Sequence, residues 1–427
     1  MDKKIEALKT FLDASHSVYH AAKNIADVLE NAGYTRLYET DKWELSAGGK
    51  YYLVRGGTAV LAFRIPEGTP TGFMMTASHS DRPTFKVKEN GVLEGKYTRL
   101  ATEKYGGMLM APWLDRPLSI AGRVMVQTEK GLESRLVDID RDLLLIPNVA
   151  IHMNRDVNDE KAWNPAVDTI PLLGSGHTVG SMQKILEEEA GGKVLGHDLW
   201  LYLRQKPSVW GVEGEYLSAQ GLDDLSCAWC STMGFLEAGE SEAIPVLCVF
   251  DNEEIGSATF QGADSEFLAG VLTRICKSRG LRLEAMLAQS FMISADNGHA
   301  VHPNHPEYAD PGNGPMLNEG VVLKFQAGKK YTTDGLSAAV FRKICAKADV
   351  PVQTFYNRGD MKGGSTLGNI SLSHVSVLSV DMGIAQLAMH SAYETVGVKD
   401  VEYLHRMFAN YFSHSMHTPA VGCYNIK

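Results

Sequence analysis

Three carboxylates crowd the end of one apolar stretch of the sequence. The stretch 244–250 (IPVLCVF) runs directly into Asp251, Glu253 and Glu254. Carboxylates this close together at the end of a buried strand repel one another, and a divalent cation is the most compact counter-charge. Because neighbouring side chains point in different directions, one glutamate could bind metal while the other handles protons. Taken alone, the segment could also be a solvated loop that follows a core strand.

Four other segments place histidine or acid after an apolar strand or turn. They are 77–81 (ASHSD), 221–224 (GLDD), 294–299 (SADNGH) and 388–391 (AMHS). Two well-placed histidines and several carboxylates suit a two-metal hydrolytic centre, in which a shared carboxylate and water bridge the ions and the pKa of that water falls towards neutrality. Mixed imidazole and carboxylate ligands favour zinc, with manganese or cobalt as substitutes.

The elements that must position these segments alternate between helix and apolar strand. Apolar spacing predicts helices at 2–14, 17–32, 223–238, 264–279, 334–348 and 399–416. Strands are expected at 51–54, 59–65, 73–78, 244–250, 290–295 and 375–380. Such alternation predicts an α/β fold with a mixed, largely parallel central sheet flanked by helices. Functional groups should then collect at the carboxyl ends of its strands.

A middle segment has a different character. Between about 85 and 220 the sequence shows short strand-like stretches, such as 118–126, 135–139 and 199–203, with turns and little sustained helical periodicity. We therefore predict a catalytic domain built from residues 1–84 and 221–427, interrupted by a β-rich insertion at 85–220.

Composition limits the classes of partner. The 427 residues carry 51 acidic and 41 basic side chains, a formal net charge of −10, which disfavours nucleic acid or an anionic membrane as a partner. The N-terminus lacks the apolar stretch of a secretion signal, and no run approaches the roughly 20 apolar residues of a membrane span. We expect a cytoplasmic protein with reduced cysteines. Cys227 and Cys230 have CxxC spacing without a second pair, which favours structural packing over a metal site.

The sequence resembles the aspartyl aminopeptidases, a branch of the dinuclear zinc exopeptidases. The resemblance extends from the N-terminal helices to the final helix, and its motifs are 79–81 (HSD), 222–223 (LD), 251–257 (DNEEIGS), 294–296 (SAD), 299–304 (HAVHPN) and 389–391 (MHS). It implies a zinc exopeptidase fold and a metal-dependent aminopeptidase that acts on short peptides. It also implies two Zn²⁺ per subunit, with Mn²⁺ or Co²⁺ as possible substitutes.

The resemblance assigns ligands position by position. It implies that His79 and Asp296 bind one metal, that Glu254 and His390 bind the other, and that Asp223 bridges both.

The same resemblance assigns proton transfer and support. Glu253 becomes the general base that takes a proton from metal-activated water and returns it to the leaving amine. Asp81 would accept the second ring N–H of His79 and fix its tautomer. Asp251 is either a similar partner of the metal ligands or an acid that ends a strand. Asp224 stays unassigned, because the family often has asparagine there.

Substrate contacts follow from the resemblance as well. It places His299 near the scissile carbonyl, Lys324 and Tyr331 against the bound amino acid, and His152 in the site of a neighbouring subunit. Ordinary alternatives are a solvated strand lysine for Lys324 and a turn aromatic for Tyr331. Nothing in the local sequence singles out His152.

Specificity depends on charge. A free α-ammonium suits an acidic site, where Glu253 and Asp296 are the carboxylates expected to bind it. Lys324, with Arg358 or Lys362, could make the side-chain pocket cationic and select Asp or Glu at the N-terminus of the substrate. The alternative is the same peptidase chemistry with a preference for neutral, Leu-type residues.

Two further classes of function compete with the peptidase. One is a non-catalytic shell or cargo protein, and the other is a glycosidase that uses Glu253 and Glu254, although adjacent residues rarely flank a sugar correctly. His302 and His305 are interpreted as structural, because prolines interrupt their stretch. The resemblance finally implies dimers formed through the insertion and a closed tetrahedral dodecamer.

Overall fold

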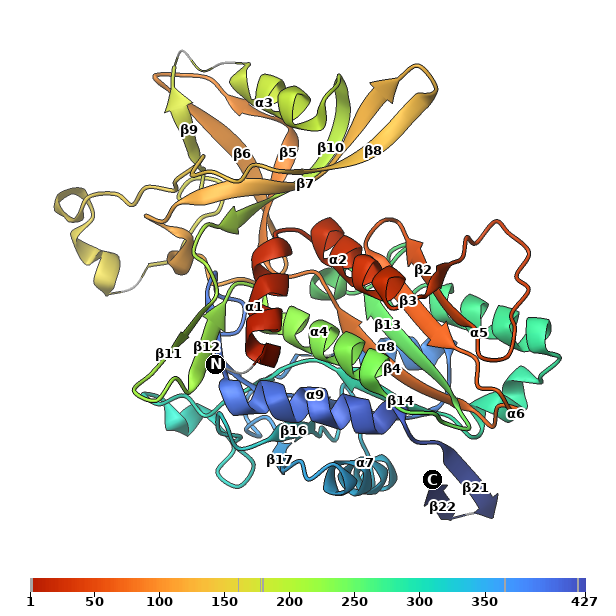
Figure 1. The fold of residues 1–427 in the computed structure, drawn as a ribbon. Coiled ribbons are helices and arrows are strands. Elements are labelled where there is room, and N and C mark those ends of the chain that lie inside the picture. Colours follow the sequence, from red (N-terminus) through yellow and green to blue (C-terminus); the bar gives the residue numbers. More distant parts are fainter. Residues whose placement is uncertain (1–2, 160, 177, 179, 365, 421) are drawn as a thin grey trace.

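A nine-stranded mixed sheet forms the centre of the protein, which is described here by a computed structural model (Figure 1). The structure describes residues 3–159, 161–176, 178, 180–364, 366–420 and 422–427. The strand order is β1 (Thr35–Arg36), β2 (Lys50–Arg55), β3 (Ala59–Arg64), β13 (Ile244–Phe250), β4 (Phe73–His79), β14 (Phe291–Ala295), β18 (Leu378–Gly383), β16 (Val321–Lys324) and β17 (Val352–Phe355). The four strands from β13 to β18 run parallel to one another, whereas β3 and β16 flank them in the antiparallel sense.

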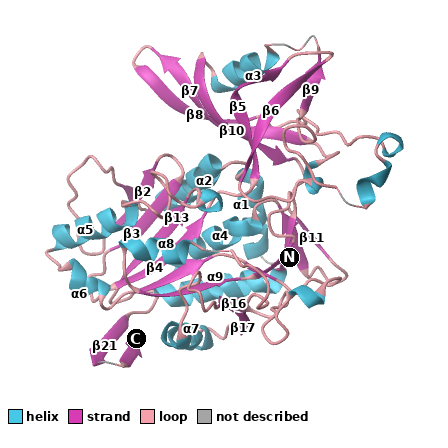
Figure 2. Ribbon diagram, turned by 180° about the vertical axis from the view of Figure 1, so that it is seen from behind, coloured by secondary structure: helices cyan, strands magenta, loops and turns pink. Residues whose placement is uncertain are grey.

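Helices cover both faces of this sheet (Figures 1 and 2). One core joins it to α1 (Lys3–Ala14), α2 (Val18–Asn31), α4 (Leu222–Glu237), α7 (Gly335–Lys347) and α9 (Val398–Phe412). The other core joins it to α5 (Phe267–Arg279), α6 (Leu283–Leu287) and α8 (Leu367–His374). This double cover explains why every residue of β4, β13 and β14 is buried and why their sequences are apolar without alternation.

A second sheet stands apart at the top of Figure 1. Its six antiparallel strands are β8 (Gly131–Asp138), β7 (Leu118–Thr128), β10 (Val194–Leu203), β5 (Thr84–Leu93), β6 (Tyr97–Tyr105) and β9 (Leu172–Ser175). Helix α3 (Ser181–Ala190) packs on it, and the two share a core that includes Phe85, Trp113 and Leu186. We call the part of the chain from β5 to β10 the inserted module.

A five-stranded sheet joins the end of this module to later parts of the chain. It consists of β11 (Ser208–Trp210), β12 (Tyr216–Ala219), β20 (Glu394–Gly397), β19 (Ala385–Leu387) and β15 (Gly298–His299). Residues 208–219 therefore pair with strands that follow residue 384, although they lie in the segment expected to be the insertion. The connection from β19 to β20 carries His390.

The predicted fold class is confirmed: a mixed, largely parallel sheet flanked by helices is accompanied by a separate β-rich part. Three local predictions were wrong. The expected strand at 375–380 begins only at Leu378, because 367–374 is helix α8, and a short apolar run does not separate the two states. The helix expected at 399–416 ends at Phe412, since 416–420 pairs as β21 (Met416–Ala420) with β22 (Cys423–Ile426). Helix α3 interrupts a segment expected to have little helix.

Two sequence expectations concern membranes and cysteines. Among the described helices, none is long and apolar enough to cross a membrane. All six cysteines are free, and Cys227 and Cys230 are buried on α4, as structural packing requires.

Candidate metal centre

Three parallel strands end at one edge of the central sheet and deliver acidic or imidazole side chains there. His79 is the last residue of β4, and it pairs with Phe250, the last residue of β13. The segment 251–254 therefore leaves the sheet directly beside His79. Strand β14 ends at Ala295, one residue before Asp296. Since the carboxyl ends of parallel strands meet at one edge, a sequence pattern repeated in distant segments becomes one cluster in space.

Two connections add the remaining ligands. Asp223 lies at the start of α4, where it and Asp224 have non-helical dihedral angles and share a cis peptide bond. His390 lies in the β19–β20 connection with a φ of +65°, and Ala388 in the same turn has a φ of +54°. Left-handed conformations of residues other than glycine are strained and tend to persist at functional sites, where the surroundings enforce them.

Asp223 stands between the two histidines. Its Oδ1 lies 3.6 Å from His79 Nε2, and its Oδ2 lies 3.6 Å from His390 Nε2, which is also 3.4 Å from Glu254 Oε2. Two ligand atoms that each bind one tetrahedral zinc at about 2.1 Å lie about 3.4 Å apart. The observed separations therefore fit two metal positions that share Asp223.

The ligand groups have the same composition as the assignment made from the sequence. One group is His79, Asp223 and Asp296, another is Asp223, Glu254 and His390, and within each group the ligand atoms lie within 4.8 Å of one another. A third group combines His79 with Glu253 and Glu254. The structure thus brings all five expected ligands and Glu253 together.

Unpartnered oxygens show that this cluster suits cations. Asp223 Oδ1 and Glu254 Oε1 are buried and have no hydrogen-bond partner within the described part of the chain. Burial, together with repulsion from Asp223, raises the pKa of Glu254 well above its usual value. A buried carboxylate oxygen without a donor is costly, and two imidazoles with several carboxylates form a set that zinc accepts.

Asp81 supports this centre through several bonds. Its Oδ1 and Oδ2 accept the backbone N–H groups of Glu253 and Glu254, each at 3.1 Å. Its Oδ2 also accepts the hydroxyl of Tyr105 at 2.8 Å. The ring Nδ1 of His79 lies 3.1 Å from the backbone carbonyl oxygen of Asp81 and 3.3 Å from its Oδ1. Donation from Nδ1 leaves Nε2 of His79 available to a metal.

Glu253, the other glutamate of this segment, also has a raised pKa. Burial raises its pKa to about 8, although attraction by His79 opposes the rise and repulsion from Asp296 adds to it. A carboxyl group that titrates near neutrality is suited to take up and release a proton at physiological pH. Its neighbour Asp251 accepts Asn252 N–H at 2.7 Å and Gln261 Nε2–H at 3.2 Å, and it joins none of the metal-binding groups formed by the described residues.

Two acidic residues support the ligands without having been assigned from the sequence. Asp224 accepts the backbone N–H of His79 at 3.2 Å, and burial raises its pKa well above the usual range. Glu394 accepts the backbone N–H groups of Asp223 at 3.1 Å and His390 at 2.7 Å. Glu394 opens strand β20 instead of ending one, so the pattern of acid after an apolar strand does not identify it.

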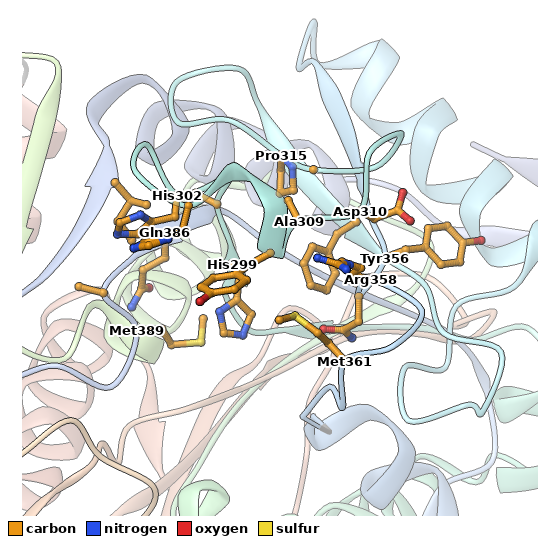
Figure 3. A pocket seen from close by; sticks show the side chains of 18 of the residues that line it. His299, His302, Ala309, Asp310, Pro315, Tyr356, Arg358, Met361, Gln386 and Met389 are labelled. Carbon is orange, nitrogen blue, oxygen red and sulfur yellow. The ribbon is translucent and has the colours of Figure 1, made fainter. Parts of the chain in front are cut away.

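A cavity of about 440 Å³ adjoins the metal ligands (Figure 3). His299 and Met389, the residue before His390, belong to its wall, and Arg358 and Lys362 give it positive charge. In Figure 3, Met389 lies on one side, Arg358 on the other, and His299 between them. Partial desolvation and nearby Lys324 lower the pKa of His299, which favours its neutral form.

Lys324 and Tyr331 lie inside the protein. Lys324 is 2% exposed, which excludes the alternative of a solvated strand lysine. Its Nζ donates to the carbonyl oxygen of Asn297 at 3.0 Å, lies 3.6 Å from Asp296 Oδ1 and is 5.2 Å from the centre of the Tyr331 ring. Attraction by Asp296 raises the pKa of Lys324 despite its burial, so the side chain is charged.

The structure does not bring His152 to this site within one chain. His152 is exposed in the short helix η2 (Ile151–Met153), in the yellow segment that protrudes at the left of Figure 1. His302 and His305 line the cavity, where their Nδ1 atoms contact the backbone N–H of Asn304 and the carboxylate of Glu307. Neither joins a metal-binding group of the described residues.

Known proteins resemble the whole chain. The probable M18 family aminopeptidase 2 of Clostridium acetobutylicum is 42% identical over 432 residues, covering 97% of this chain and 100% of the relative. That of Stutzerimonas stutzeri is 36% identical, covering 96% and 98%. A chain in the cryo-EM structure of the Ape4 and Nbr1 complex has a TM-score of 0.93 at 31% identity, covering 96% of this chain and 85% of that one. The S. cerevisiae mApe1 dodecamer has a TM-score of 0.84 at 27% identity, covering 96% of each.

The family model described as aminopeptidase I zinc metalloprotease (M18) matches residues 11–412. This span includes every candidate metal ligand described above. The chain therefore belongs to the M18 family of zinc metallo-aminopeptidases.

Proposed function

We propose that this M18 aminopeptidase uses two zinc ions and Glu253 as general base to remove N-terminal Asp or Glu from short peptides. The observation that carries the proposal is the position of Asp223, whose two carboxylate oxygens each face one histidine at 3.6 Å. Membership of a metalloprotease family leaves no place for the glycosidase alternative.

The ligands divide into two sets around this bridge. His79 and Asp296 would hold one zinc ion, Glu254 and His390 would hold the other, and Asp223 would contribute one oxygen to each. When bound, such a pair polarises a peptide carbonyl and lowers the pKa of water. The positive charge of bound zinc would also favour the ionised form of nearby carboxyl groups, so the pKa of Glu253 would fall below about 8.

Glu253 then moves the proton. Its carboxylate accepts one from the attacking water and donates it to the nitrogen of the departing amine, so that the residue ends the cycle ionised again. Asp81 keeps Glu253 in place by accepting its backbone N–H.

Glu253→Gln tests the base. The amide keeps the size of the side chain but cannot accept the proton, so we expect kcat to fall by about 10²–10⁴-fold. Rates on amino-acid anilides and zinc content per chain are measured together. Full zinc content with lost turnover supports the assignment, whereas near wild-type turnover contradicts it. Glu266→Gln, which changes an exposed glutamate paired with His374, serves as the control.

Charge around the cavity supports the preference for acidic residues. Arg358 and Lys362 line the cavity, and Lys324 adds a buried cation beside Asp296. Arginine and lysine bind carboxylates through charge-assisted hydrogen bonds, whereas the α-ammonium of the substrate fits the carboxylates of Glu253 and Asp296. Tyr331 and His299 complete the surroundings proposed for the bound amino acid.

A substrate panel tests this preference. Wild-type protein should hydrolyse Asp and Glu anilides faster than Leu anilide. Because a hydrogen bond to a charged group contributes about 1.5–3 kcal/mol, Arg358→Met combined with Lys362→Met should lower kcat/KM for Asp and Glu by about 10–100-fold. The rate on Leu anilide should stay within about twofold. Wild-type turnover of Leu anilide well above that of Asp and Glu would establish the neutral alternative.

Assembly forms the last part of the proposal. The segment 85–220 is proposed as a dimerisation insertion between the catalytic parts 1–84 and 221–427, with dimers joining in a tetrahedral dodecamer in the cytoplasm. Val149, Ile151 and Met153 are exposed on the segment that protrudes at the left of Figure 1, which suits burial against another subunit. The similarity to the mApe1 dodecamer supports the assembly, and the free cysteines are typical of a cytoplasmic protein. Gel filtration at the 46.7 kDa of one chain would contradict it.

A further inference from the structure

Glu394 lies beside two of the candidate metal ligands, Asp223 and His390. Strand β20 begins at Glu394, which pairs with Ala219 of β12, and this register places it two residues from the Gly221 turn that leads into Asp223. The side chain is 1% exposed. Its Oε2 accepts the backbone N–H of Asp223 at 3.1 Å, and its Oε1 accepts the backbone N–H of His390 at 2.7 Å.

This carboxylate is not itself a ligand. Glu394 belongs to none of the metal-binding groups formed by the described residues. Both of its oxygens are occupied by N–H donors, which leaves it aimed at the backbone of two ligands instead of at a cation. The positive charge of Arg82 attracts Glu394, but its Nη1 and Nη2 groups donate their hydrogen bonds to the carbonyl oxygens of Ser15 and His16. Burial and repulsion from Asp223 raise the pKa of Glu394 well above its usual value, so placing this acidic side chain here is costly. A role in fixing the backbone therefore explains its presence better than a role in stability.

The conformation of His390 shows why such a restraint is needed. Its φ of +65° is unfavourable for a residue with a side chain, and the neighbouring Ala388 is also left-handed. The N–H of His390 is held by Glu394, and its carbonyl oxygen accepts the N–H of Leu109 at 3.0 Å. Both polar groups of this strained peptide are therefore fixed from outside the turn.

We propose that Glu394 is a positioning residue that sets the spacing of the two zinc positions by holding Asp223 and His390 to one carboxylate. Asp223 supplies an oxygen to both positions and His390 completes the second, so a shift of either backbone changes the geometry of the second position most. The inference rests on the proposed two-zinc centre. Loss of a residue that orients metal ligands typically weakens metal affinity by about 10–100-fold.

Glu394→Gln removes half of this restraint with little change in shape. The amide oxygen can accept one N–H, but its NH₂ group then faces the other N–H as donor against donor. The buried carboxylate of Asp400 provides a matched control, because it accepts the backbone N–H groups of Asn318 at 2.6 Å and Gly320 at 2.8 Å, which belong to no metal ligand. Asp400→Asn makes the same chemical change away from the centre.

The test compares zinc binding by chelator-treated full-length chains in a competition titration, with zinc as the probe. Wild type should bind two zinc ions, and Glu394→Gln should bind the second at least about tenfold more weakly, whereas Asp400→Asn should match wild type. Equal affinities for wild type and Glu394→Gln, or an equal loss in both variants, would overturn the inference. A wild-type chain that binds a single zinc would instead contradict the proposed two-zinc centre.

A folding defect is recognised separately. The melting temperature of each metal-free variant is recorded, and the rise caused by zinc is the quantity compared. If Glu394→Gln does not fold, Glu394→Asp replaces it, because the shorter carboxylate can keep one N–H but not reach both. An unchanged zinc-induced rise in Glu394→Asp would also overturn the inference.

Discussion

The central nine-stranded sheet and the inserted module differ in where their ionisable side chains lie. The central sheet gathers His79, Glu254 and Asp296 at one edge, where their side chains are buried. The inserted module is an antiparallel sheet with a separate apolar core, and no metal-binding group forms among its described residues. Parallel strands covered on both faces can expose functional groups only at their ends, which is where these residues lie.

The module nevertheless reaches the metal centre. Tyr105, the last residue of β6, donates its hydroxyl to Asp81 at 2.8 Å and accepts Asn252 Nδ2–H at 2.8 Å. Gly106 has a φ of +74°, and a Cβ there would lie 3.1 Å from the Cβ of Glu254. Together with the bond from Leu109 to His390, these contacts show that the module supplies a hydroxyl and backbone groups to the surroundings of the candidate ligands, which come from the central sheet and from two connections.

His152 provides the strongest test of the difference between the two regions, because this residue of the module is proposed to act in the site of a neighbouring subunit. We expect His152→Ala to lower activity by at least about tenfold, because the module would then contribute nothing to its neighbour's site. Oligomers assembled from His152→Ala and inactive Glu253→Gln subunits together should regain part of the activity, since the Glu253→Gln subunits still provide His152. In a random mixture of equal parts, about a quarter of the sites would combine both intact residues.

The complementation is read as specific activity against the fraction of each variant after the oligomers are dissociated and reassembled. The two variants assayed separately provide the baseline. Activity equal to the sum of the separate variants would show that His152 does not act across subunits.

Tyr105→Phe tests the contact between the module and its own metal centre. Removing the hydroxyl leaves Asp81 without one donor, and a net hydrogen bond of this kind contributes about 1–2 kcal/mol. We expect kcat to fall by about tenfold with KM nearly unchanged, because Asp81 positions Glu253 and His79. Tyr202→Phe is the control, since this buried module tyrosine donates to Ile139 O at 3.3 Å, away from the metal ligands. An equal loss of activity in both variants would indicate a general loss of stability.

The same comparison explains what the sequence can predict. His79, Glu254 and Asp296 lie at or just after the ends of apolar strands, so the apolar pattern is enough to indicate their segments as metal-binding candidates, although the family resemblance assigns the individual ligands. Asp223 and His390 depend on a family resemblance, since they lie in connections. Tyr105 and Glu394 act through hydrogen bonds to residues far away in the sequence. Tyr105 ends an antiparallel strand of the inserted module and Glu394 begins β20, so neither fits the pattern of an acid or histidine at the end of an apolar strand of the central sheet.

Strand boundaries and strand pairing are also difficult to predict from local sequence. Val375 and Val377 continue the apolar alternation of β18 back towards α8, so the sequence predicts a strand that starts too early. In the structure these two residues pack in the same core as α8, whereas Val380 and Met382 of β18 belong to the other core. Residues 208–219 have the short strands expected of the insertion, and the sequence does not indicate that β12 pairs with β20, which lies more than 170 residues further along the chain. Pairing between distant strands is set by tertiary contacts, which local periodicity does not contain.

The smallest expected effect is an opposite pH response of the two regions in the metal-free chain. Burial raises the pKa of Glu253 to about 8 and that of Asp251 to about 7. Their protonated forms stabilise the folded state fully below the pKa of the unfolded chain, and this stability is lost as pH rises through 7 and 8. In Asp198, ion pairs with Arg123 and Lys86 overcome burial and lower the pKa, so its contribution is lost as pH falls below about 4.

Melting temperatures of chelator-treated protein from pH 5 to 8.5 measure the first response. We expect a fall of a few degrees with rising pH, because the carboxyl groups of the catalytic centre must ionise against one another. Zinc should stabilise the protein more at high pH, where the ligands are ionised before it binds. Glu253→Gln carries no charge at this position, so its slope should be flatter, whereas Asp198→Asn should leave the slope above pH 5 unchanged. A slope identical in wild type and Glu253→Gln would show that the pH response arises outside the metal centre.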